Sequence, residues 1–136
     1  MALKIRLKPD EKILIGRAVV TNGPKASEFY IENTAPVLRE KDIMKEDAAT
    51  TPVRRLYFLV QLMYVDEPNL ASYHHAYWNL VKEIVAAAPS TTLLITQLSD
   101  LILAGDYYKA LKTARSLIEY EESLLAQTTG LPQQSD

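Results

Sequence analysis

The sequence contains no cysteine, only four glycines and a single tryptophan in 136 residues. Without cysteine, the chain can form no disulfide, no thiolate metal site and no cysteine nucleophile. The four glycines stand at turn positions, so no glycine-rich loop is available to cradle a phosphate. These absences exclude several classes of enzyme and metalloprotein, and they fit a protein of a reducing cytoplasm.

Neither a signal peptide nor a membrane-spanning segment is expected. Charges stand at every second position near the N-terminus, which leaves no apolar core of signal-peptide length. The longest nearly uncharged apolar run, residues 56–65, is about half of what a bilayer crossing needs. We therefore expect a soluble, cytoplasmic protein.

Charge is low overall but unevenly distributed. The net charge is −2. Residues 1–55 hold 11 of the 15 Lys and Arg against 8 acids, a balance of +3, whereas residues 56–136 hold 4 bases against 9 acids, a balance of −5. The opposite signs suggest different partners for the two halves. A balance of +3 is modest, so nucleic-acid binding would require local clustering of bases.

The first 48 residues are predicted to form a small antiparallel β segment. In residues 3–8, Leu and Ile alternate with Lys4, Arg6 and Lys8, the pattern of a half-buried strand with a basic outer face. Turn residues at 21–25 and further apolar stretches indicate four or five short strands. Because so small a sheet is marginal by itself, we expect it to pack on the helices, on a second copy of itself in a homodimer, or on both.

Residues 49–128 are predicted to form a bundle of about four helices, which makes the chain α+β. Thr51 suits an N-cap and Pro52 the first helical position. Near the start of the last helix, Gly105 suits the C-cap of the preceding helix, and the next residue suits an N-cap. The tail at residues 129–136 is predicted to be disordered.

The helical half offers little catalytic chemistry. His74 and His75 are the only histidines, and adjacent helical positions point roughly 100° apart, so one metal ion cannot easily use both. The acids Glu119, Glu121 and Glu122 are expected to form a solvated face. The tyrosines of this half are expected in the core or at an interface. We therefore expect neither an enzyme nor a protein with a cofactor or a metal.

The basic strand face is the remaining candidate site. Its lysines and arginine lie about 7 Å apart along one edge, near the phosphate spacing of an extended single strand. Arg39 would approach this edge if the last strand paired with the first. The residues alone leave open a second interpretation, an edge whose lysines discourage aggregation. The candidate RNA-binding residues are Lys4, Arg6, Lys8, Arg39, Arg54 and Arg55.

Four segments together resemble the flagellar biosynthesis repressor FlbT family of α-proteobacteria: "LKIRLKPDEKILIGRAVV", "APVLREKDIM", "TTPVRRLYFLVQLMYVD" and "GDYYKALKTARSLIEYE". The resemblance implies a post-transcriptional repressor that binds the 5′ untranslated region of flagellin mRNA and promotes its decay. It also implies a small protein partner, FlaF, which acts in the opposite sense.

Residues 1–45 are also similar to the mRNA-binding regulator CsrA, through "DEKILIG" and "APVLREKDI". This resemblance implies a β fold whose first and last strands grip single-stranded RNA. It assigns Arg39 as a main RNA contact and places Arg6 and Lys8 on the first strand. Leu38 stands where CsrA has a histidine. The helical half has no counterpart there.

Two functions stay open. In the first, the β half binds RNA and the helical half binds a protein partner. In the second, the chain is a helical adaptor for FlaF or flagellin that acts on mRNA only indirectly, because tyrosine is enriched at interfaces.

Overall fold

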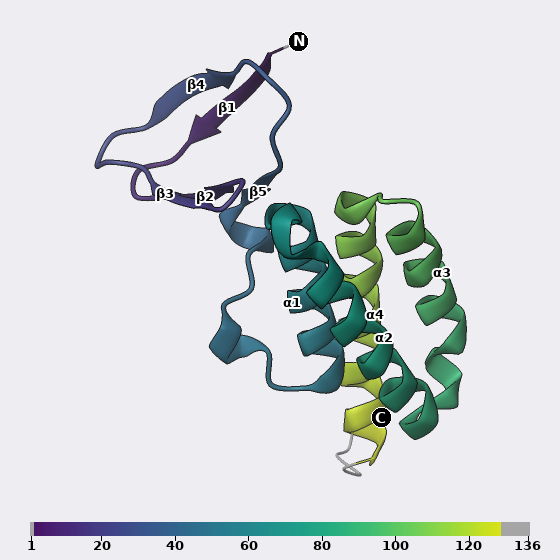
Figure 1. Ribbon diagram of the computed structural model, residues 1–136. Helices are drawn as coiled ribbons and strands as arrows, with labels where there is room; N and C mark the ends of the chain where they lie inside the picture. Colours follow the sequence, from purple (N-terminus) through teal and green to yellow (C-terminus); the bar gives the residue numbers. More distant parts are fainter. Residues whose placement is uncertain (1, 129–136) are drawn as a thin grey trace.

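The computed structural model describes residues 2–128 and confirms the predicted α+β order, with five strands followed by four helices in that range (Figure 1). The predicted tail at residues 129–136 lies outside the described residues. The strands are β1 (Leu3–Leu7), β2 (Lys12–Ile15), β3 (Ala18–Thr21), β4 (Ser27–Ile31) and β5 (Val37–Arg39). The helices are α1 (Pro52–Val65), α2 (Leu70–Ala87), α3 (Thr92–Leu103) and α4 (Tyr107–Thr128).

The strands form two small antiparallel sheets. One is the ribbon β1–β4, and the other has the order β3–β2–β5. The last strand therefore pairs with β2 and not with β1, so strand pairing is not what would bring Arg39 to the basic edge of the first strand. The reason is burial: Leu14 and Leu38 stand opposite each other in the β2–β5 pair, and both belong to the hydrophobic core of the helices.

Asn22 ties the two sheets together at one end. Its side-chain amide donates hydrogen bonds to the carbonyl oxygens of Leu7, Lys8 and Lys25, at 3.3, 2.7 and 2.9 Å. The Ser27 hydroxyl donates back to its Oδ1 at 2.6 Å. Through these bonds the predicted turn at 21–25 is fastened to the end of β1. Lys8 and Lys25 therefore lie at the same end of the strand region.

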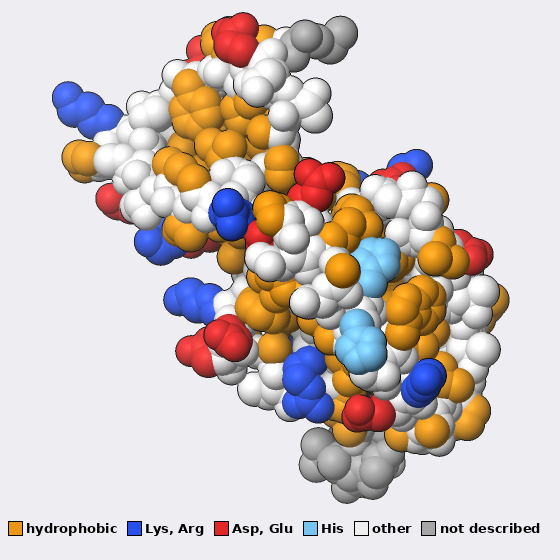
Figure 2. Space-filling model, viewed as in Figure 1, with side chains coloured by type: hydrophobic (Ala, Val, Ile, Leu, Met, Phe, Trp, Pro, Cys, Tyr) orange, Lys and Arg blue, Asp and Glu red, His pale blue; other side chains and the backbone are white. Residues whose placement is uncertain are grey.

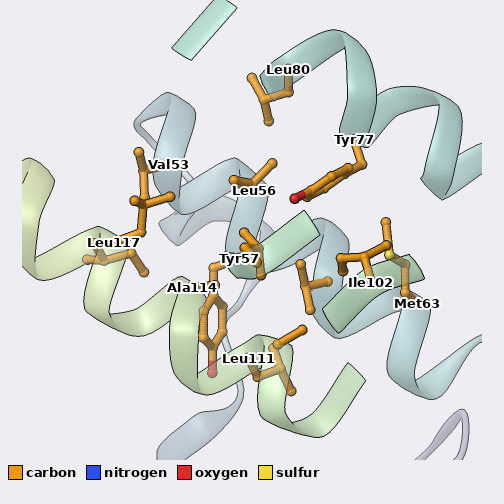
Figure 3. Packing of buried hydrophobic residues seen from close by; sticks show 14 of the residues in the cluster. Val53, Leu56, Tyr57, Met63, Tyr77, Leu80, Ile102, Leu111, Ala114 and Leu117 are labelled. Atoms are coloured by element: carbon orange, nitrogen blue, oxygen red, sulfur yellow. The ribbon is translucent and has the colours of Figure 1, made fainter. Parts of the chain in front are cut away.

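Helix α1 is the central helix of the bundle. It packs against α2 and α4, and α3 packs against α4. Side chains from these helices, among them Leu56, Tyr77 and Leu117, meet in a close-packed interior (Figure 3). The predicted N-cap is confirmed, since Thr51 Oγ1 accepts the Arg54 N–H at 3.1 Å. No helix in residues 2–128 is both long and apolar enough to cross a membrane.

A linker of two 3₁₀ turns, Glu40–Asp42 and Glu46–Ala48, joins the strands to the bundle. Neither turn contains a buried residue, so side chains of α1 hold the linker in place. The Tyr57 hydroxyl donates to the carbonyl of Asp42 at 2.6 Å. Gln61 accepts the Met44 N–H at 2.7 Å and donates to its carbonyl at 3.0 Å. The ribbon β1–β4 projects away from the bundle (Figure 1).

Candidate nucleic-acid interface

The predicted basic face of β1 is partly neutralised. Lys4 and Arg6 both contact the Glu28 carboxylate on β4, at 3.2 and 2.9 Å. The Arg6 side chain remains 74% exposed. Tyr30, which stands opposite Lys4 in the register, is 54% exposed. The ribbon therefore presents an exposed aromatic ring beside cations, an arrangement suited to stacking a base next to a phosphate.

Arg39 lies near Arg6, although their strands do not pair. Its Nη2 donates to the carbonyl oxygen of Arg6 at 2.6 Å and to the Glu11 carboxylate at 3.2 Å. Its buried Nε has no hydrogen-bond partner within the described residues, and 38% of the side chain is exposed. The guanidinium thus holds β5, the end of β1 and the turn after β1 together.

The Glu11 carboxylate is the centre of that arrangement. It accepts the Lys8 backbone N–H at 2.9 Å as well as the Arg39 guanidinium. The Lys8 hydrogen bond lowers the pKa of Glu11, burial opposes it, and Arg39 lowers it further. Glu11 therefore stays ionised to a lower pH than an ordinary glutamate.

The remaining predicted residues lie elsewhere. Lys8 follows the end of β1 and is exposed. Arg54 and Arg55 lie in the first turn of α1, which begins at the end of the bundle away from the strands (Figure 1). Arg54 pairs with Glu122 of α4 at 2.7 Å, and Arg55 is exposed. The structure brings the predicted bases of the strands together but leaves these two arginines apart from them.

Two lysines near Lys8 were not among the predicted site residues. Lys12 begins β2, and Lys25 belongs to the turn that Asn22 fastens to Lys8. We call Lys8, Lys12 and Lys25 the basic tip. Among the described residues, none of the three forms an ion pair with a carboxylate. Figure 2 shows Lys and Arg side chains projecting from the outer margin of the strand region, beside an exposed hydrophobic surface.

The sequence carried part of the signal for the basic tip. The turn at residues 21–25 was predicted, and Lys25 is its last residue. The pairing of β1 with β4, which places this turn beside Lys8, was not predicted from the sequence. Lysines in two separate turns become neighbours only once that pairing is known.

A groove of about 630 Å³ separates the linker from α1 and α4; we call it the linker groove. Its cations come from β2, the linker, α1 and α4. They are Lys12, Lys41, Lys45, Arg54 and Arg115. Its carboxylates are Glu40, Asp42, Glu119 and Glu122. Glu40, Lys41 and Asp42, whose charges alternate directly after β5, therefore line one wall of this groove.

The predicted solvated acidic face of α4 is wrong for one of its members. Glu121 is half-buried, and its Oε1 accepts the Thr51 hydroxyl at 2.5 Å. Its Oε2 accepts the Val53 N–H at 3.3 Å. A carboxylate in this position satisfies free N–H groups in the first turn of α1 and interacts favourably with the helix dipole.

Comparison with known proteins gives one family. The family model described as "Flagellar protein FlbT" matches residues 3–125. A probable flagellum biosynthesis repressor protein FlbT 1 of Bradyrhizobium diazoefficiens is 45% identical over 128 residues, covering 93% of this chain and 87% of its own. A probable FlbT repressor of Rhodopseudomonas palustris is 44% identical, covering 93% and 99%. The flagellum biosynthesis repressor protein FlbT of Caulobacter vibrioides is 40% identical, covering 92% and 90%. No solved structure matches significantly.

Proposed function

Because the chain belongs to the FlbT family, we propose that it represses flagellum biosynthesis after transcription, by binding the 5′ untranslated region of flagellin mRNA and promoting decay of that message. Relatives in Bradyrhizobium and Caulobacter are named flagellum biosynthesis repressors, which supports the regulatory part of the proposal. The RNA-binding part is supported by the distribution of charge on the strands.

The basic tip is the observation that carries the RNA-binding part. Its three lysines are exposed and have no carboxylate partner among the described residues, so they can exchange water and counterions for phosphates without breaking an ion pair. The exposed Tyr30 ring on the same ribbon adds a stacking surface. No catalytic step is required: the bound leader becomes accessible to nucleases or closed to ribosomes.

The test is a fluorescence-anisotropy titration of the purified protein with a labelled flagellin leader at about 50 and 200 mM salt. We expect Lys8→Ala/Lys25→Ala to weaken binding and to flatten the salt dependence by about 0.7 per lost contact in log K against log salt. The matched control is Lys82→Ala/Lys109→Ala, two exposed lysines of the helices. Binding by the tip variant equal to that of the control would overturn the RNA-binding part.

A second candidate function is that of an adaptor for FlaF or flagellin. The observation that favours it is the surface of α3, where Leu93 and Leu103 are each 70% exposed on a helix without a basic residue. An apolar helical interface responds little to salt, whereas phosphate binding weakens steeply. Adding FlaF to the titration separates the two: a salt-insensitive protein complex, with no RNA binding by the protein alone, supports the adaptor.

A further inference from the structure

We propose that the linker groove holds a phosphodiester of the bound RNA, so that the strand runs from the basic tip past Lys12 to Lys41 and Lys45 of the linker. This inference rests on the proposed RNA binding and extends it, because it adds a second contact region built from both halves of the chain. Lys12 belongs to the basic tip and also lines the groove, which makes the two surfaces continuous.

The charges inside the groove leave cations available. Two arginines are paired with carboxylates, Arg54 with Glu122 at 2.7 Å and Arg115 with Asp42 at 3.4 Å. Lys41 and Lys45 have no carboxylate within ion-pair distance among the described residues. Both are exposed, so contact with a phosphate breaks no existing ion pair. Unpaired lysines on one wall and oriented arginines on the other suit an anion between them.

The Glu40 carboxylate lies beside these lysines in the sequence, but a backbone hydrogen bond already holds it in place. Its Oε1 accepts the Lys12 backbone N–H at 2.7 Å, so the carboxylate is held against the start of β2. Within residues 2–128, the Lys12 ammonium itself donates only to the Thr21 hydroxyl, at 3.1 Å. It therefore remains a cation available at the junction of tip and groove.

Arg115 is held in a fixed orientation. Its Nη2 donates to the Tyr57 hydroxyl at 3.0 Å, and its guanidinium carbon lies 5.3 Å from the centre of that ring. Burial raises the pKa of Tyr57, although Arg115 opposes this, so the hydroxyl stays neutral and donates to the Asp42 carbonyl. A guanidinium oriented in advance loses little conformational freedom when it binds a phosphate. The cavity volume falls within the range of roughly 300–1,000 Å³ that is usual for ligand sites.

Binding in the groove also has a consequence for the linker. The two 3₁₀ turns bury no residue and are held by hydrogen bonds from Tyr57 and Gln61. A phosphate that bridges linker lysines and helix arginines would fasten the linker to the bundle. We therefore expect backbone amides of residues 40–48 to exchange more slowly in the presence of RNA.

The experiment compares two groove variants with matched controls in the leader titration. Lys41→Ala/Lys45→Ala is paired with Lys82→Ala/Lys109→Ala, and we expect it to weaken binding several-fold and to flatten the salt slope by about 1.4, at 0.7 per contact.

Glu119→Gln removes an exposed acid of the groove that has no ion pair among the described residues, and its control is Glu83→Gln on α2. We expect Glu119→Gln to tighten binding about twofold, because repulsion of the phosphate is lost. A gain in affinity cannot result from misfolding.

The outcomes separate this inference from the proposed function. If the basic-tip variant loses affinity while both groove variants match their controls, the groove inference is overturned and the RNA-binding proposal stands. If the parent protein binds no leader RNA, both are overturned. Loss of affinity by the groove variants together with slower linker exchange in the parent complex supports the groove as a phosphate site.

Discussion

Arg39 shows how a residue that resembles a ligand contact can also hold the fold together. The resemblance to CsrA assigns it to RNA, whereas the structure engages its guanidinium with the Arg6 carbonyl and the Glu11 carboxylate. Its side chain stays 38% exposed, so an RNA phosphate would have to share it with Glu11. If an Arg39 variant lost RNA binding, its stability would have to be measured as well, because the substitution also removes contacts that hold the fold together. Variants of the lysines of the basic tip break no ion pair among the described residues.

Glu11 gives a pH-dependent test of this arrangement. Its pKa is lowered in the folded protein from an ordinary value of 4.5, so its contribution to stability is complete above that pH and is lost as the pH falls through the lowered folded-state pKa. We expect Glu11→Gln to be less stable than the parent at pH 7, with the difference shrinking below about pH 4.5. The measurement is urea unfolding followed by circular dichroism between pH 3 and 7.

Arg39→Ala supplies the matching control for Glu11. The hydrogen bond from the Lys8 N–H is the largest single cause of the lowered pKa of Glu11 and remains in Arg39→Ala, so removing the guanidinium should weaken the pH dependence only in part. If Glu11→Gln and the parent differ by the same amount at every pH, Glu11 does not stabilise the fold through its charge.

At the scale of single elements, Gln61 is a buried polar residue in the central helix α1, and its hydrogen bonds to the linker account for its burial. It is 4% exposed, and both ends of its amide bond the backbone of Met44 in the linker. Gln61→Leu would leave an N–H and a carbonyl of Met44 without these partners, and we expect it to lower the free energy of unfolding by about 2 kcal/mol. Gln97→Leu, at an exposed position of α3, should change it by less than about 0.5 kcal/mol. Equal effects in the two urea-unfolding curves would mean that Met44 finds water instead.

The sequence predicted those element boundaries that depend on near neighbours. Thr51 caps α1 as expected, and Gly105 ends α3 with a φ of 76°. The strand with which β5 pairs was not predictable, because a strand of three residues carries almost no periodicity. The burial of Leu38 against the helices decides the pairing. The same holds for the half-buried Glu121, whose partner Thr51 is 70 positions away.

At the scale of the whole molecule, the two halves meet where their opposite charges face each other. Exposed acids of α4, Glu119 and Glu122, line the same groove as the linker lysines. The charge asymmetry along the chain was visible in the sequence, but the groove was not. Arg115 contacts Asp42 across 73 positions, and only the packing of α4 on α1 brings that contact about. Composition alone therefore indicated that the halves differ, while the tertiary fold creates the surface they share.

The described part of the molecule has two clusters of buried hydrophobic residues, and we expect a Leu→Ala substitution to affect stability differently in each. Leu38 is 1% exposed within the large core that also contains helix side chains, whereas Leu7 is 3% exposed in a small cluster whose other buried members are Ile5 and Ile13. We expect Leu38→Ala to lower global stability by about 2–5 kcal/mol, because its cavity opens between β5 and the bundle. Leu7→Ala should chiefly speed amide exchange in β1 and β4, leaving the unfolding midpoint of the helices nearly unchanged. Urea unfolding with residue-level hydrogen exchange distinguishes them, and an equal loss of helix stability in both variants would show that the strands and the bundle unfold as one cooperative unit.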